Sequence, residues 1–470
     1  MKHEWLETCF EMMYEYLPKS FQDYEARKKF NEISVHAESA EEYAVKLKSN
    51  KYGIESIGLD FCDFDYDLAN GYNKVAKYEQ ALTWFQKGLS YISDYPDREH
   101  SRIIDFYSNI SAVHQELGQY RKGEEWAEKA LSICEIYYNK NDLKAAAAYN
   151  NITVSRMYQG KFDDVLKLNL KALEIRKKQS GEESEDVANT SSNIGFYYKT
   201  IGDFDNALEW YTKAMNIREK IYGKINLSFA NSCSGVADIY KYKADYDKAL
   251  EHYHIALEAR KEILKEEHTD VALSYNDIAI VYDHTGNFDE ALKWNAKALK
   301  IVQKVLGENH PYTATTYANT AGIYYRKGDS KKALEYHFKS LELKERLLGN
   351  KHTDVAISYN NIAVVNYELK EYDESLKWSL KALKIFENSP MKEHPDTAAV
   401  YNNMGNIYYC KNDLDKSLEW YLKDLAIIEK AYGAEHPVTL NAYKNIAEIY
   451  EELGDFEKAE EYYKKALRQG

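Results

Sequence analysis

The sequence is poor in turn-forming residues and has no pattern typical of a secreted or membrane protein. Its 470 residues include 21 glycines and 6 prolines, too few for an all-β protein of this size. The five cysteines form no CxxC pair and no disulfide spacing, which favours reduced packing residues. No apolar run approaches the ~20 residues that span a bilayer. Glutamate interrupts the apolar stretch at the N-terminus, unlike a signal peptide. These absences predict a cytoplasmic protein without membrane insertion.

The sequence also lacks an excess of positive charge and any catalytic signature. The formal net charge is −14, which repels phosphate backbones, and lysine and arginine gather in no basic stripe. Nucleic acid is therefore not expected as a partner. P-loop, GxGxxG, HExxH and GxSxG signatures do not occur, and no pair of carboxylates stands out as a general acid and base. We expect a protein without enzymatic activity, cofactor or metal.

What the sequence does contain is a repeat of 42 residues. Stepping by 42 from Asn361 gives a column in which seven of ten members are asparagine. This Asn column consists of Asp67, Asn109, Asn151, Asn193, Gly235, Asp277, Asn319, Asn361, Asn403 and Asn445. Ten units follow one another without an inserted or deleted residue. A fixed period of this length is typical of helical repeat arrays.

Each unit reads as two helices joined by a polar turn that commonly contains glycine. In most units an aromatic residue, such as Phe162, opens the second helix. Two further columns of small residues, seven positions apart, lie on the second helix. One of them contains Asp424 where most units have alanine. The small residues of these two columns and the large residue between them form one stripe along the second helix. A single hairpin cannot bury that stripe, whereas stacked neighbours can.

The large position of the second helix holds six of the seven tryptophans. They are Trp84, Trp126, Trp210, Trp294, Trp378 and Trp420. This is the tetratricopeptide pattern with a period of 42 rather than ~34 residues. Segments such as LGENHPYTATTYANTAGIYYRKGDSKKALEYHFKSLEL resemble the tetratricopeptide domain of kinesin light chains and their bacterial relatives. The resemblance covers roughly residues 59–470. It implies an all-α fold, a right-handed α-solenoid of about ten antiparallel helix hairpins.

The first part of the chain lies outside the repeat. We therefore divide the sequence into a helical segment, 1–58, and ten repeats, 59–470. The N-terminal segment has an apolar stripe that includes Trp5, Leu6 and Phe10. Such a segment covers the exposed apolar face of the first repeat as a cap. A docking or dimerisation segment is the alternative.

A histidine also recurs every 42 residues, at His268, His310, His352, His394 and His436. Zinc requires ligands that converge to ~2 Å, whereas helix packing separates one histidine per hairpin from the next by ~10 Å or more. A metal site is therefore not expected. Each histidine precedes proline or threonine where a helix is expected to begin. We predict that these residues cap helix N-termini.

The resemblance implies that the first helices line a concave face that binds ligands. Its inward positions are one before the Asn column, on it, and three, six and seven after it. An asparagine amide both donates and accepts, so it can bind the backbone of an extended peptide. Hydrogen bonding within the fold is the alternative role. The candidates are Asn150, Asn151, Asn193, Asn276, Asn319, Asn360, Asn361, Asn402 and Asn403.

Selectivity is expected from the variable inward positions. The candidates are Tyr158, Lys199, Lys241, Tyr242, Tyr325, Arg326, Tyr367 and Tyr409, with Arg156 one place nearer the core. Basic side chains gather in repeats three to five. The predicted partner is therefore a protein or peptide with an acidic or aromatic-acidic segment. The predicted function is that of a non-enzymatic scaffold or adaptor. The alternative is a regulatory or sensor solenoid that controls an effector, fused after Gly470 or bound in trans.

Overall fold

The regular elements of the described residues are helices. The computed structural model describes residues 55–75, 77–92, 99–138 and 142–467, together with Phe30, Glu32 and Ser34 as single positions. In these ranges lie twenty α-helices, α3 to α22, and one 3-10 helix, η1 (Pro390–Glu393). No strand occurs in the described part of the chain. The all-α prediction is confirmed.

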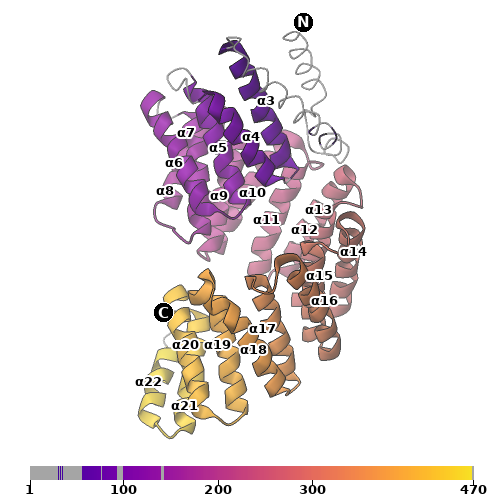
Figure 1. Ribbon diagram of the computed structural model, residues 1–470, viewed down its shortest axis with the longest axis vertical. Coiled ribbons are helices and arrows are strands. Elements are labelled where there is room, and N and C mark those ends of the chain that lie inside the picture. Colours follow the sequence, from indigo (N-terminus) through magenta and orange to yellow (C-terminus); the bar gives the residue numbers. More distant parts are fainter. Residues whose placement is uncertain are drawn as a thin grey trace, which may run out of the picture. The chain divides into compact units, whose positions relative to one another are not determined.

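The helices form consecutive antiparallel pairs in two compact units (Figure 1). Met1–Glu266, the first unit, contains α3 (Glu55–Lys74), α4 (Tyr78–Ile92), α5 (His100–Glu116), α6 (Tyr120–Tyr137), α7 (Leu143–Tyr158), α8 (Val165–Ser180), α9 (Glu185–Thr200), α10 (Phe204–Tyr222), α11 (Leu227–Tyr242) and α12 (Tyr246–Leu264). Glu267–Gly470, the second unit, contains α13 (Thr269–His284), α14 (Phe288–Leu306), α15 (Pro311–Arg326), α16 (Ser330–Leu348), α17 (Thr353–Glu368), α18 (Tyr372–Glu387), α19 (Pro395–Cys410), α20 (Leu414–Tyr432), α21 (Pro437–Glu452) and α22 (Phe456–Ala466). The predicted solenoid of about ten hairpins is confirmed.

Small side chains allow the two helices of a hairpin to approach closely. A Cβ atom added at Gly405 would lie 2.6 Å from the ring of Tyr421 on the second helix of the same hairpin. Serines in the small columns also bond the facing backbone, as the Ser417 hydroxyl does to the Gly405 carbonyl at 2.9 Å. The same contact joins Ser375 to Ala363 at 2.7 Å. The small columns therefore set the distance between the helices.

The turn inside each hairpin requires a left-handed backbone. Glycine supplies it in most hairpins, for example Gly328 with φ of 86°. Ala244 and Lys370 take the same position with φ of 56° and 62°. The expectation that Phe162 opens a second helix is wrong. Asp164 has φ of 61°, and α8 therefore begins at Val165.

The predicted segment 1–58 falls almost wholly outside the described residues. Of its side chains, Phe30 is fully buried, and its ring packs edge-on against Tyr72 of α3 at 5.2 Å. That contact covers Gly71, where an added Cβ would meet the Phe30 ring at 2.1 Å.

The five recurrent histidines cap helices, as the sequence predicted. In each, Nδ1 accepts a hydrogen bond from the backbone N–H two residues later, at the N-terminus of α13, α15, α17, α19 or α21. The same column holds Asp142, Ser184 and Asn226 in the first unit, which cap α7, α9 and α11. Histidine therefore replaces the usual capping residues in the second unit.

Replacing His310 with alanine is expected to lower the free energy of unfolding of the second unit by about 1 kcal/mol, the usual value of a cap. H310D should retain most of that stability, because aspartate also accepts from the backbone N–H. Burial lowers the pKa of His310 below 6.5, so the cap is complete above pH 6.5 and is lost as the pH falls through the lowered pKa. Urea unfolding of the wild type, H310A and H310D at pH 7.5 and pH 5 measures both effects. A wild type and H310A that differ equally at both pH values would contradict the capping role.

Candidate functional site

First helices lie next to one another along each unit. Those of neighbouring hairpins touch, α3 with α5, α5 with α7 and α7 with α9 in the first unit, and α13 with α15 and α17 with α19 in the second. Among the described helices, no second helix contacts the next second helix to a comparable extent. We call the exposed sides of α5, α7, α9 and α11, and of α13, α15, α17, α19 and α21, the first-helix face of each unit.

Asparagines of the Asn column hydrogen-bond to the preceding hairpin. Their Nδ2 atoms donate to a residue 43 positions earlier. The pairs are Asn151 with the Ser108 carbonyl (3.0 Å), Asn319 with Asn276 Oδ1 (2.6 Å) and Asn403 with Asn360 Oδ1 (2.9 Å). The buried Asn150 donates instead to Thr190 at 3.5 Å. The within-fold role that the sequence left open is therefore present at these positions. Asn193 and Asn361 are half-buried on α9 and α17.

Tyrosines of the second unit, six residues after the Asn column on the first helices, also connect neighbouring hairpins. Tyr325 donates to Glu368 at 3.4 Å, and Tyr409 donates to Glu452 at 2.5 Å. Tyr367 lies 3.3 Å from the Cys410 sulfur. Arg326 connects to the preceding hairpin, whereas the tyrosines reach the following one. Its Nε atom lies 2.8 Å from a carboxylate oxygen of the buried Asp283. The structure thus brings four predicted site residues into one set of hairpin-to-hairpin contacts. They are Tyr325, Arg326, Tyr367 and Tyr409.

The predicted basic residues of the first unit have different partners. Arg156 is paired with Glu124 at 2.7 Å, and Lys241 with Asp238 at 2.9 Å. Lys199 lies 5.0 Å from the Phe196 ring centroid and has no carboxylate within salt-bridge distance among the described residues. Burial lowers the pKa of Lys199, and the carboxylate of Asp238 partly restores it. Lys199 is therefore the basic group of this set that remains open to an external carboxylate.

The two predicted tyrosines of the first unit stack on the aromatic residues that begin α6 and α10. The Tyr158 ring lies 4.5 Å from that of Tyr120, with the ring planes at 5° to each other. The Tyr242 and Phe204 rings are 5.3 Å apart at 4°. Both tyrosines remain more than half exposed. They present flat apolar surface whose orientation is already fixed.

A column of buried arginines was missed by the sequence reasoning, although it follows the same period. Arg176, Arg218 and Arg260 extend from α8, α10 and α12 and are 7–8% exposed. The Arg218 guanidinium bonds Asn189 at 2.6 Å on α9 and Ser232 at 2.6 Å on α11. The Arg218 guanidinium therefore lies between two successive first helices, α9 and α11.

In the second unit the corresponding space is an open pocket of about 680 Å³ between α19, α20 and α21. A directed chain of hydrogen bonds crosses it. Tyr421 donates to Asn406 at 2.6 Å, Asn406 to Asn402 at 3.2 Å, and Asn402 to the Oδ2 atom of Asp424 at 3.3 Å. Asp424 is only 4% exposed, and burial raises its pKa to about 7. The Asn402 side chain predicted from the sequence is thus part of the pocket, together with Asn403.

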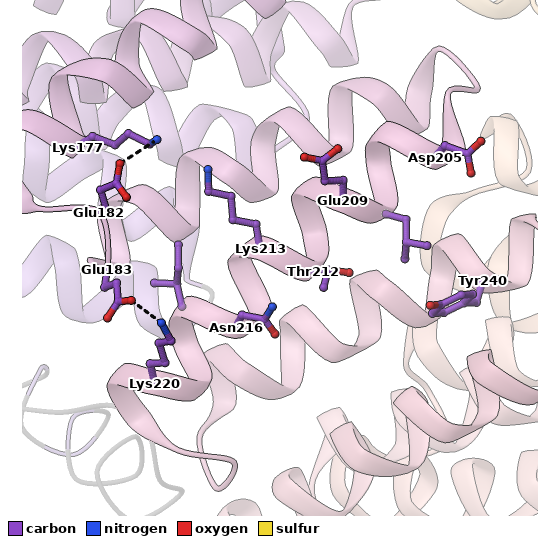
Figure 2. Close-up of a pocket in the computed structure, with 12 residues that line it drawn as sticks. Lys177, Glu182, Glu183, Asp205, Glu209, Thr212, Lys213, Asn216, Lys220 and Tyr240 are labelled. Carbon is purple, nitrogen blue, oxygen red and sulfur yellow. Dashed lines mark hydrogen bonds and ion pairs between the residues drawn. The ribbon is translucent and has the colours of Figure 1, made fainter.

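A second cavity, of about 610 Å³, runs along α10 in the first unit (Figure 2). Its charged side chains come in both signs and are partly paired. Figure 2 shows Lys177 beside Glu182, at 3.3 Å, and Lys220 paired with Glu183. Because most of its lining belongs to α10, a second helix, this cavity is separate from the first-helix face.

The described part of the chain offers no metal centre and no membrane span. No group of three or more His, Cys, Asp and Glu residues in it is placed to hold a metal ion. None of its helices has the length and apolar character that a bilayer crossing requires.

Comparison with known families settles the repeat type. Residues 144–220, 229–301, 278–346, 354–423 and 396–469 match one family model described as tetratricopeptide repeat, and residues 104–142 match another with the same description. The chain belongs to the tetratricopeptide-repeat family. The matching descriptions name a repeat and no reaction. No curated protein matches this tetratricopeptide-repeat chain in sequence.

Solved tetratricopeptide-like structures share its fold. The apo form of RapI is 16% identical, covers 77% of the chain and 96% of its own, and has a TM-score of 0.50. BtubC from P. vanneervenii is 22% identical over 50% of the chain and 87% of its own, with a TM-score of 0.40. A putative kinesin light chain from Podosopora anserina is 17% identical over 44% of the chain and 98% of its own, also at 0.40. The family models confirm the predicted tetratricopeptide repeats, and at these identities the likeness to solved structures concerns the fold.

Proposed function

We propose that the protein is a non-enzymatic scaffold or adaptor that binds a partner protein or peptide on its first-helix face. The observation that supports this most is the series of amide, phenol and carboxylate groups joined from hairpin to hairpin, such as Asn403 with Asn360 and Tyr409 with Glu452. Groups held in this way lose little conformational freedom when a ligand binds. A regulatory solenoid would use the same face and differ in what the bound partner does.

In the first unit we propose that an acidic or aromatic-acidic segment binds at α9 and α11. Lys199 supplies the positive charge, because Arg156 and Lys241 are already paired with carboxylates of the fold. The Tyr158 and Tyr242 rings supply flat apolar contact on either side of Lys199 along the sequence. A partner carboxylate at Lys199 would also offset the cost of burying the ammonium group.

K199E is expected to weaken binding of an acidic peptide about tenfold, the size of one charge-assisted hydrogen bond. A peptide array probed with the full chain selects the sequence, and fluorescence anisotropy then measures its dissociation constant. K178E is the matched control, because Lys178 on α8 is exposed and carries the same charge change. An array without preference for acidic segments, or equal affinity for K199E and wild type, would contradict the proposal.

A further inference from the structure

The pocket between α19, α20 and α21 differs from its counterparts in the first unit at two positions of the repeat. Where α8, α10 and α12 carry Arg176, Arg218 and Arg260, the same position of α20 is Ile428. Four residues earlier, most repeats have alanine and α20 has Asp424. In the first unit the Arg218 guanidinium lies between α9 and α11, whereas in the α19–α20 hairpin the basic group is missing and a carboxylate is added.

The polar groups of the pocket are arranged to accept hydrogen bonds. The chain of donors from Tyr421 through Asn406 and Asn402 ends on Oδ2 of Asp424. The Oδ1 atom of Asp424 accepts no hydrogen bond from any described residue. Asn403 uses its Nδ2 outside the pocket, on Asn360, which leaves its carbonyl oxygen as an acceptor. A ligand that satisfies these atoms must be a donor.

The charge of the pocket has the same sign throughout. Asp396 and Asp424 line it, and its lining contains no lysine or arginine. Burying an ionised carboxylate without a cation is costly. In the first unit the arginine that stands in place of Ile428 does face a carboxylate, because Arg218 lies 3.1 Å from Glu185. The second unit has the carboxylate without the cation.

We propose that this pocket binds the guanidinium group of an arginine side chain from the partner protein, with Asp424 and Asn403 as its acceptors. The proposal rests on the scaffold function, and it names the chemistry of the partner at the second unit. Guanidinium has five N–H donors in a plane and is weakly hydrated. That suits a site with several amide acceptors and one buried carboxylate oxygen. Within this chain, guanidinium is also the group that occupies the equivalent space between α9 and α11, where Arg218 is 7% exposed.

A small probe tests the pocket independently of any peptide. Saturation-transfer NMR with n-butylguanidinium and the full chain at pH 8 is expected to give saturable binding that falls about tenfold in D424A. Alanine occupies the position in other repeats, so this variant keeps the fold. D415N is the matched control, because Asp415 is exposed on the same helix. Equal binding in D424A and wild type, or equally tight binding of n-butylammonium, would overturn the assignment.

Peptide display on wild type and D424A extends the test to the partner. We expect peptides selected on wild type to carry arginine at one fixed position, and that preference to disappear on D424A. Peptides that bind both proteins with the same sequence preference would overturn the arginine site and leave the scaffold function standing. Binding of n-butylguanidinium without any selected peptide would support the pocket and contradict the scaffold function.

Discussion

Replacing Arg218 with alanine is expected to lower the free energy of unfolding of the first unit by about 3 kcal/mol, because it removes several hydrogen bonds of a buried guanidinium and leaves a cavity. The guanidinium is 7% exposed and bonds Glu185, Asn189, Ser192 and Ser232. Three of these residues belong to α9 and one to α11. R218A therefore leaves acceptors of two hairpins without donors and opens a cavity between them.

Urea unfolding followed by tryptophan fluorescence measures the loss, and amide hydrogen exchange locates it. Exchange should rise in α9, α10 and α11 first, because each repeat is stabilised by its neighbours. R121A is the control: Arg121 is 87% exposed in its side chain, and its one ion pair among the described residues is with Glu125 at 3.4 Å, so its loss should cost less than about 0.5 kcal/mol. R218K is expected to fall between the two, since one ammonium cannot reach acceptors on both helices. An R218A protein as stable as R121A would show that the buried network does not join the hairpins.

The fold could be predicted from the sequence because its information is local and repeated. The 42-residue period fixes the hairpins, the small columns fix the close approach of their helices, and the histidine position fixes where a helix begins. The prediction of helix boundaries failed where one hairpin departs from the repeat pattern. At Asp164 a non-glycine residue takes the left-handed conformation, and the helix starts three residues after Phe162.

The candidate site was less predictable, because its contacts depend on how hairpins are staggered. Tyr325 and Glu368 are 43 residues apart, not 42, and neither column indicates the other as its partner. The pairing of Lys241 with Asp238 could likewise be known only from the geometry of the folded helices. The same holds for the conclusion that Lys199 has no such partner among the described residues. The arginine column had a signal in the sequence, its spacing of 42, but a charged residue on a second helix reads as exposed until its burial is known.

Asp424 had a signal in the sequence too, as the one acidic member of a column of small residues. The free-energy cost of burying its carboxyl group, however, appears only in the structure. The carboxyl group is 4% exposed, and Asn402 is its one hydrogen-bond donor among the described residues. The pKa rises from 3.8 to about 7 because burial disfavours the charged form. Ionisation of this group in the folded protein therefore costs on the order of 4 kcal/mol above pH 7.

D424A is accordingly expected to raise the free energy of unfolding of the second unit by about 3 kcal/mol at pH 8, after allowing about 1 kcal/mol for the donor left on Asn402. Below the unfolded pKa of 3.8 the carboxyl is protonated in both states, and the gain vanishes. It grows as the pH rises towards 7 and is constant above that value. Urea unfolding of wild type and D424A between pH 4 and pH 8 measures this window, with the exposed Asp415→Ala as control. A gain independent of pH would exclude ionisation as its cause. If n-butylguanidinium stabilises the wild type alone, the difference in stability between D424A and wild type disappears. That result would connect the cost of the buried carboxylate to the cation it is proposed to bind.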